Sequence, residues 1–271
     1  MRIFAIRDAN DREKKNLAYL FYYEREKYFY IELPDNADPW EVPLLLSSLL
    51  KKGNYTIDSY WSKRWVQQRV VPSDRQNIGQ ILRDNKLDFY DEYSLLMLAR
   101  GRCAQDDYYV VRIDEQELPI EVQRRFHTKV TDIVPLENYF MLVFFADGAT
   151  KKCDLKTYFK SNERFNVLLR MPEYFAEAWI LPGGYGVSWD ENLSVPDADL
   201  YKMGQDVPLA LSDFCSFVQK RVVNVAETAK ILNCSRQNID DLTKRGKLHP
   251  IKATGKNTLY LKSEILKRLW Q

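Results

Sequence analysis

The stretch VNVAETAKILNCSRQNIDDLTKRGKLHPIKATGKNTLYLKSEILKRLW, residues 223–270, decides the fold of the C-terminal part of the chain. Asn224, followed three residues later by Glu227, predicts a capping box at the start of a helix. Ala226, Ala229 and Leu232 lie along the inner side of that helix. Alanine at position 229 is small enough to let a second helix cross closely.

The second helix follows after the tight turn Asn-Cys-Ser. Asn233 tolerates the left-handed conformation that such a turn needs, and Ser235 predicts the N-cap of the new helix. Ile239 and Leu242 then point back into the core, and Gly246 ends the helix. Two helices joined by three residues are therefore expected between positions 224 and 246.

The remainder of the stretch predicts a basic hairpin and a closing helix. The strands HPIKA and TLYLK surround the tip TGKN, and Ser263 is expected to cap the helix EILKRLW. This order is that of a winged helix-turn-helix. It resembles the excisionase-like and MerR-like DNA-binding domains, except that Asn233 stands where glycine is commoner.

The resemblance implies that the first turn of the second helix enters the major groove of DNA. Arginine suits the two acceptors of guanine, and glutamine or asparagine suits adenine; the lysines and arginine further on suit phosphates. Asp240 and Asp241 weigh against a tight fit, unless they face away from the DNA backbone. The predicted DNA-binding residues are Ser235, Arg236, Gln237, Asn238, Lys244, Arg245, Lys252, Lys256 and Asn257.

The charge of the chain is unevenly distributed. Residues 216–271 hold 12 lysines and arginines and 4 acidic residues, a net charge of +8, whereas the remainder holds 28 and 34, a net charge of −6. Such asymmetry is typical of a nucleic-acid-binding segment joined to an acidic body. The alternative is a solvated basic surface on a small domain that docks proteins.

The residue content argues against several other classes of protein. Four scattered cysteines and two histidines favour neither a disulfide framework nor a zinc site. No apolar run is long enough for a membrane span, and the start is not typical of a signal peptide. We therefore expect a cytoplasmic protein with no metal and no cofactor.

The segment DRQNIGQILRDNKL, residues 74–87, aligns without a gap on SRQNIDDLTKRGKL, residues 235–248. The surroundings differ, because Trp61 and Trp65 replace the small crossing residue and acidic residues replace the basic hairpin. We interpret the repeat as a look-alike. Its Arg-Gln-Asn is expected on a helix surface after an Asp74 cap, with Ile78, Ile81 and Leu82 facing inward.

Other elements of the N-terminal region are a hairpin of 19–23 and 28–33, and helices over 42–53, 57–70 and 91–101. Ile57, Trp61 and Trp65 are spaced for one buried face. The region resembles the N-terminal subdomain of the HipA-type kinases through Arg69, Pro72 and Arg75 and through the stretch 91–101. The resemblance implies partner binding without catalysis, because no kinase domain follows.

The middle region predicts strands over VTDIVPLENYFMLVFFADGATKKCDL, with Asp147-Gly148 at a hairpin tip, and a further strand pair around PGGYG. Together with GVSWDENLSVPDADLY it resembles a small bacterial domain family of unknown function. The aromatic residues Phe144, Phe145 and Trp189 are expected in its core.

The predicted fold class is α+β multidomain. Its parts are a strand-plus-helix N-terminal module (1–115), a small β-rich α+β middle domain (125–206) and a C-terminal winged helix-turn-helix (216–271).

The predicted function is a sequence-specific DNA-binding transcriptional regulator, antitoxin-like or autoregulatory, that binds double-stranded DNA as a homodimer. The alternative is a non-catalytic adaptor or antitoxin that binds a HipA-type kinase through its N-terminal module. An enzyme is not expected, because no nucleophile, base and orienting group can be assembled from the motifs.

Overall fold

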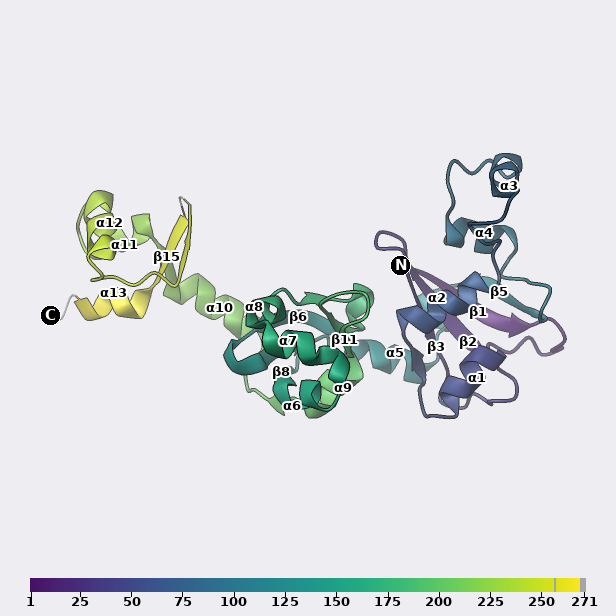
Figure 1. The fold of residues 1–271 in the computed structure, drawn as a ribbon. Helices are drawn as coiled ribbons and strands as arrows, with labels where there is room; N and C mark the ends of the chain where they lie inside the picture. The colour runs from purple at the N-terminus through teal and green to yellow at the C-terminus, as the bar shows by residue number, and fades with distance from the viewer. Residues whose placement is uncertain (256, 269–271) are drawn as a thin grey trace. The chain divides into compact units, whose positions relative to one another are not determined.

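The structure is a computed structural model that describes residues 1–255 and 257–268. Its contacts divide the chain into two compact units, one of Met1–Asp147 with Lys152–Gly204 and one of Gly148–Lys151 with Gln205–Gln271. The predicted α+β class is confirmed, since short helices accompany several antiparallel sheets (Figure 1). Within the described ranges, no helix has the length and apolar composition needed to cross a membrane.

A five-stranded antiparallel sheet forms the centre of residues 1–127, in the order β4-β3-β2-β1-β5. The predicted hairpin is confirmed as β2 and β3, which pair Tyr22 with Phe29. Lys27, at the end of its four-residue turn, takes a positive φ of 60°. The elements are β1 (Arg2–Asp8), β2 (Ala18–Tyr23), β3 (Tyr28–Glu32), α1 (Leu44–Leu50), β4 (Thr56–Ile57), α2 (Ser59–Gln67), α3 (Ile78–Asp84), α4 (Glu92–Leu98), β5 (Tyr108–Ile113), η1 (Glu115–Glu117) and α5 (Ile120–His127).

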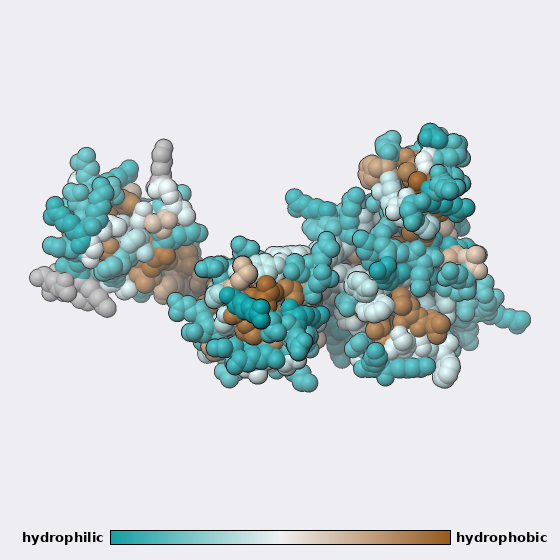
Figure 2. Space-filling model, in the orientation of Figure 1, coloured by the Kyte–Doolittle hydropathy of each residue, from teal (hydrophilic) through white to brown (hydrophobic). Residues whose placement is uncertain are grey.

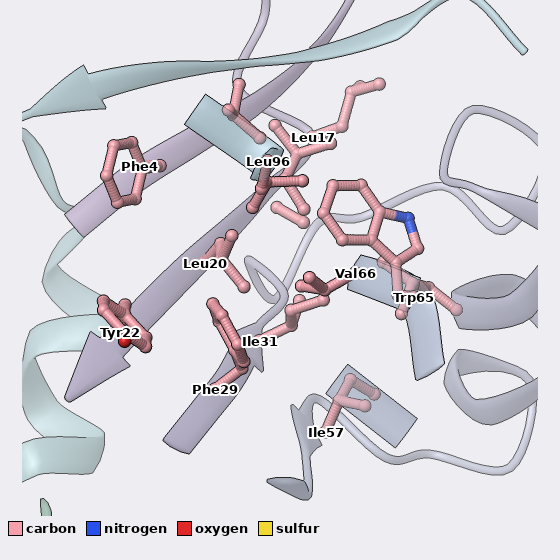
Figure 3. Packing of buried hydrophobic residues seen from close by; sticks show 14 of the residues in the cluster. Phe4, Leu17, Leu20, Tyr22, Phe29, Ile31, Ile57, Trp65, Val66 and Leu96 are labelled. Atoms are coloured by element: carbon pink, nitrogen blue, oxygen red, sulfur yellow. The ribbon is translucent and has the colours of Figure 1, made fainter. Parts of the chain in front are cut away.

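Both faces of this sheet are buried, because successive strand residues point to opposite faces and both sets are apolar. Phe4, Leu20 and Ile31 pack on one face against residues of α1, α2 and α4, among them Trp65 (Figure 3). On the other face, Phe21 packs with residues of α5 and of the following region. The sheet is therefore a central layer covered on both sides.

The structure corrects several predictions for residues 57–84. Ile57 is buried in β4 rather than in a helix, and Trp61 of α2 is 38% exposed whereas Trp65 is fully buried. Asp74 caps nothing, because α3 begins only at Ile78 and has Asn77 as its N-cap. The Arg-Gln-Asn of the repeat therefore lies in a turn, not on a helix. No residue of α3 is fully buried, so its predicted inward face is only half-covered.

The region after residue 127 contains the predicted strands and a compact aromatic core. Phe144, Phe145 and Trp189 are buried, as predicted, and Trp189 packs on Phe159 and Phe175. The PGGYG segment turns between β9 and β10, which pair with β11 in the order β11-β10-β9. The elements are β6 (Val130–Pro135), η2 (Glu137–Tyr139), β7 (Phe140–Phe145), β8 (Thr150–Asp154), α6 (Leu155–Lys160), η3 (Glu163–Phe165), α7 (Asn166–Arg170), α8 (Pro172–Ala176), β9 (Trp179–Ile180), η4 (Pro182–Gly184), β10 (Gly186–Ser188), β11 (Ser194–Pro196) and α9 (Asp197–Met203).

A buried ion cluster joins the two parts of the first unit. The Nζ atom of Lys129 lies 3.6 Å from Glu32 Oε1 and 3.1 Å from Asp197 Oδ2, and all three residues are at most 5% exposed. The ammonium also sits 3.7 Å from the centre of the Tyr185 ring, which stacks on Tyr30 at 3.8 Å. These contacts connect residues 1–127 with residues 129–197, so both belong to one compact unit. The predicted boundaries at 115 and 125 stay predictions.

Elements of the second unit lie mostly after residue 204. A helix over 211–221 was not predicted, although the spacing of Leu211, Phe214 and Val218 is a signal for one. Ser263 lies inside the last helix rather than capping it, because the helix begins at Lys262. The elements are β12 (Gln205–Asp206), α10 (Leu211–Arg221), β13 (Val222–Asn224), α11 (Val225–Ile231), α12 (Arg236–Lys244), β14 (Lys252–Thr254), β15 (Asn257–Leu261) and α13 (Lys262–Arg268).

Replacement of Lys129 by methionine is expected to destabilise the first unit by about 3 kcal/mol, because buried Asp197 loses its cation, whereas Glu32 keeps Arg125 at 2.9 Å. Burial raises the pKa of Asp197, and Lys129 opposes that rise. Without the lysine the pKa rises further, so protonation restores stability and the deficit shrinks as pH falls. Denaturant unfolding of both chains at pH 7 and pH 5 measures this.

The matched control is Lys15→Met, which removes an exposed pair with Glu13 at 3.2 Å. That change is expected to leave the stability almost unchanged at either pH, because solvent screens an exposed ion pair. Equal losses in the two variants would contradict a stabilising role for the buried cluster.

Candidate nucleic-acid interface

The first helix of the C-terminal part, α11, begins with the predicted capping box. Asn224 Oδ1 accepts a hydrogen bond from the Glu227 amide at 2.9 Å, and Glu227 Oε2 accepts one from the Asn224 amide at 2.9 Å. Both interactions use side chains to satisfy amides that a helix start leaves without partners. Ala229 is 7% exposed where α11 meets α12. The small side chain therefore allows the close crossing that the sequence predicts.

The turn to the second helix, α12, also has the predicted geometry. Asn233 takes a φ of 49°, and the Cys234 amide donates to the Ala229 carbonyl at 3.0 Å. The Ser235 hydroxyl accepts a hydrogen bond from the Asn238 amide at 3.2 Å, so α12 begins at Arg236. Gly246, with a φ of 62°, follows its end. Local hydrogen bonds therefore fix both ends of the turn.

Side chains beneath α12 fix the helix on a small core. Ile239 is fully buried and packs with Val223, Leu248, Tyr260 and Ile265, among others. This core anchors the inner side of the helix and leaves its outer side open to solvent.

A polar contact ties the end of α12 to the hairpin that follows. The hydroxyls of Thr243 and Tyr260 are 2.8 Å apart, and Tyr260 belongs to β15. Sequence reasoning missed this contact, which no pattern of spacing would have revealed.

A second polar contact joins the segment before β14 to α13, where His249 Nδ1 lies 2.9 Å from Glu264 Oε1.

The hairpin belongs to a three-stranded antiparallel sheet in the order β13-β15-β14. Lys252 pairs with Leu259 and Thr254 pairs with Asn257, so the predicted strands are present, with bounds that differ by one to three residues. Lys252 and Asn257 are both exposed. Lys256, also predicted as a DNA contact, lies outside the described residues.

Arg236, Gln237 and Asn238 form the exposed first turn of α12, as the sequence predicts. Lys244 and Arg245 are exposed at its other end. The surface over this helix is hydrophilic in the space-filling view (Figure 2). The structure therefore brings together on one helix three side chains that can read base edges and two cations that suit phosphates. Ser235 is exposed too, but its oxygen serves the helix cap.

Asp241 lies on the exposed, outer side of α12. Residues three or four apart share one side of a helix, so Gln237, Asp241 and Lys244 form one exposed row opposite Ile239. Asp240 is exposed beside it. A carboxylate therefore stands between a potential base reader and a potential phosphate contact.

Residues 222–271 match a family described as a helix-turn-helix domain. The match covers α11, the turn and α12, and includes every predicted contact residue. Comparison of the chain with curated proteins and with solved structures gave no significant match. The helix-turn-helix assignment is thus confirmed, and it indicates DNA binding. The resemblances of residues 1–115 to the HipA-type subdomain and of 125–206 to a bacterial domain family find no support and stay predictions.

The described part of the chain contains no group of three histidine, cysteine or acidic side chains placed to hold a metal ion. The exposed polar and charged side chains of α12 allow recognition through hydrogen bonds and charge. Arg236, Gln237 and Asn238 can form hydrogen bonds with base edges, and Lys244 and Arg245 can pair with phosphates.

Replacement of Asp241 by asparagine is expected to strengthen binding to any DNA duplex several-fold, because one negative charge leaves the exposed row. Titration of labelled duplexes of unrelated sequence, at fixed salt, measures the gain. The control is Glu227→Gln, which removes the same charge at the start of α11. Weaker binding by the Asp241 variant would instead mean that the carboxylate accepts a hydrogen bond from a base.

Proposed function

We propose that the protein is a sequence-specific DNA-binding transcriptional regulator that reads the major groove with α12. The observation that carries the proposal is the exposed turn of Arg236, Gln237 and Asn238 on a helix held by its cap and by Ile239. In helix-turn-helix proteins the start of the second helix contacts base edges. Arginine reads guanine, and glutamine or asparagine reads adenine.

Charge supports the same surface. The net charge of +8 over residues 216–271 attracts the phosphate backbone, and each neutralised phosphate releases counterions. Lys244 and Arg245 extend the positive charge along α12, and Lys252 adds to it on the hairpin. In the proposal the hairpin acts as a wing, where Lys252 and Asn257 contact phosphates and fix the register of α12.

The regulator acts as a homodimer in this proposal, because one short helix contacts few base pairs. A two-fold operator binds the α12 helix of each copy at one half-site. It is antitoxin-like or autoregulatory and binds DNA near its own gene. No catalytic step is assigned to it. The proposed site of action is duplex DNA inside the cell.

A comparison of Arg236→Ala with Lys252→Ala tests whether α12 contacts bases and the hairpin contacts phosphates. The first change should weaken binding to the cognate site by about 1–3 kcal/mol and relax specificity at one base pair, because a base contact is lost. The second should weaken binding to all sequences alike and reduce the salt slope by about 1. Fluorescence titrations on the chain's own upstream DNA, across a salt series, measure both.

The control variant is Lys230→Ala, which removes an exposed charge from α11, away from the first turn of α12. It should leave the sequence preference unchanged. If Arg236→Ala kept full affinity and specificity, α12 would not be the reader.

A second candidate is an adaptor that binds a HipA-type kinase through the N-terminal module. The observation that favours it is a pair of strongly exposed apolar side chains, Trp40 at 84% and Leu44 at 88%. Lys51 Nζ lies 4.4 Å from the centre of the Trp40 ring and holds it on the surface. Large apolar side chains in such positions are typical of protein-binding patches.

Co-purification of the full chain from its native host tests the adaptor role. A kinase should accompany the protein and be lost from the Trp40→Ala/Leu44→Ser variant, because the apolar anchor is removed. Leu98→Ser, at a 52% exposed position of the same module, is the control and should retain it. The absence of any kinase from the wild-type sample would contradict the adaptor role.

A further inference from the structure

The helix α10, directly before the helix-turn-helix, has an apolar side that its own unit leaves uncovered. All 11 of its residues are exposed. Four of them are large and apolar: Leu211 at 38%, Phe214 at 43%, Phe217 at 50% and Val218 at 39%. In the space-filling view, hydrophobic surface is visible beside the C-terminal sheet (Figure 2).

These side chains gather on one side of the helix. Leu211, Phe214 and Val218 follow the i, i+3, i+7 spacing of an apolar stripe, which Phe217 and the exposed Cys215 border. Ser212, Ser216 and Gln219 lie on the opposite side. An isolated helix shorter than about 12 residues is marginal in water, and most helices in proteins are stabilised by packing of the apolar side. A partner surface is therefore needed.

We propose that α10 pairs with α10 of a second copy of this chain in antiparallel orientation. The charges of the helix favour this occupant. Its first turn carries Asp213 and its last turn carries Lys220 and Arg221. An antiparallel pair brings the negatively charged end of each helix beside the positively charged end of the other and opposes the two helix dipoles. A parallel pair would place the two basic ends together.

The same symmetry suits the site described above. An antiparallel pair has a two-fold axis, so one patch of apolar residues serves both copies. It also joins two α12 helices through the short link from α10 to α11, as a two-fold DNA site requires. This inference deepens the proposed function, since it names the surface that pairs the two reading heads. Self-association itself is independent of DNA and is measured without it.

The size of the contact sets the expected strength. An 11-residue helix is about 16 Å long. A contact made by two such helices stays below the roughly 1,200 Å² of surface that stable interfaces bury. We therefore expect a dimer that dissociates in the micromolar range, and that neighbouring half-sites on DNA stabilise.

Sedimentation velocity of the full chain over a concentration series tests the pairing. Phe214→Asp should raise the dissociation constant of the dimer by at least about tenfold, because a charge enters the apolar contact. Ser216→Asp adds the same charge to the opposite side of the same helix and should change the constant less than about twofold. Arg236→Ala should leave it unchanged, so loss of DNA reading and loss of pairing are distinguished.

A cross-link provides a readout that does not depend on a disruptive variant. Cys215 lies one residue from the middle of α10, so the two thiols of an antiparallel pair come close to the two-fold axis. In a chain with Cys103→Ser and Cys234→Ser, a short bismaleimide should join two copies, and Cys215→Ser should abolish the product. A chain that stays monomeric at roughly 100 µM would overturn the proposal. Dimers that Phe214→Asp does not weaken would overturn it as well.

Discussion

The turn between α11 and α12 is the constraint on which the helix-turn-helix depends. Asn233 must take a left-handed conformation for the chain to reverse within three residues, and Ser235 must then cap the new helix. The first feature sets the direction of α12, and the second sets where it starts. Because Ile239 follows as the buried anchor, Arg236, Gln237 and Asn238 are left on the surface. The candidate DNA contacts are thus a consequence of helix geometry.

A different kind of constraint organises the first unit. There, Lys129, Glu32 and Asp197 lie within the protein interior, where an ammonium without partners would be costly. The cluster brings together groups from β3, the residue before β6 and the start of α9, and Tyr185 covers the ammonium with its ring. Apolar contacts alone would let these elements shift slightly relative to one another, because such contacts are not directional. The ion cluster allows fewer arrangements, because each charged group must meet its partner.

The three surfaces discussed above have different characters, which suggests separate tasks. The outer side of α12 is polar and basic, except for its two aspartates. The stripe on α10 is apolar and short, and Trp40 and Leu44 are a pair of strongly exposed apolar side chains in the N-terminal module. A regulator needs a surface for DNA, a surface for its second copy and a surface that receives a signal. The proposals assign the first two of these tasks to α12 and α10.

The repeated Arg-Gln-Asn-Ile shows that the same local sequence does not start a helix at the same position in both places. Both copies carry a capping residue and the same four letters, yet Ser235 caps a helix and Asp74 does not. The difference lies in what surrounds each copy. Ile239 is fully buried against other strands and helices, whereas Ile78 packs only partly. At Ser235 a side-chain cap and a buried apolar residue occur together, whereas α3 begins at Ile78 with neither.

The sequence by itself determined the capping box at Asn224, the turn at Asn233, the cap at Ser235 and the hairpin order. These features depend on side chains and backbone atoms within about four residues of each other. Only the tertiary structure decided that Trp61 is exposed while Trp65 is buried, and that Lys129 meets Glu32 and Asp197. Those outcomes depend on which distant surfaces cover a residue, and no local hydrogen bond or spacing specifies that.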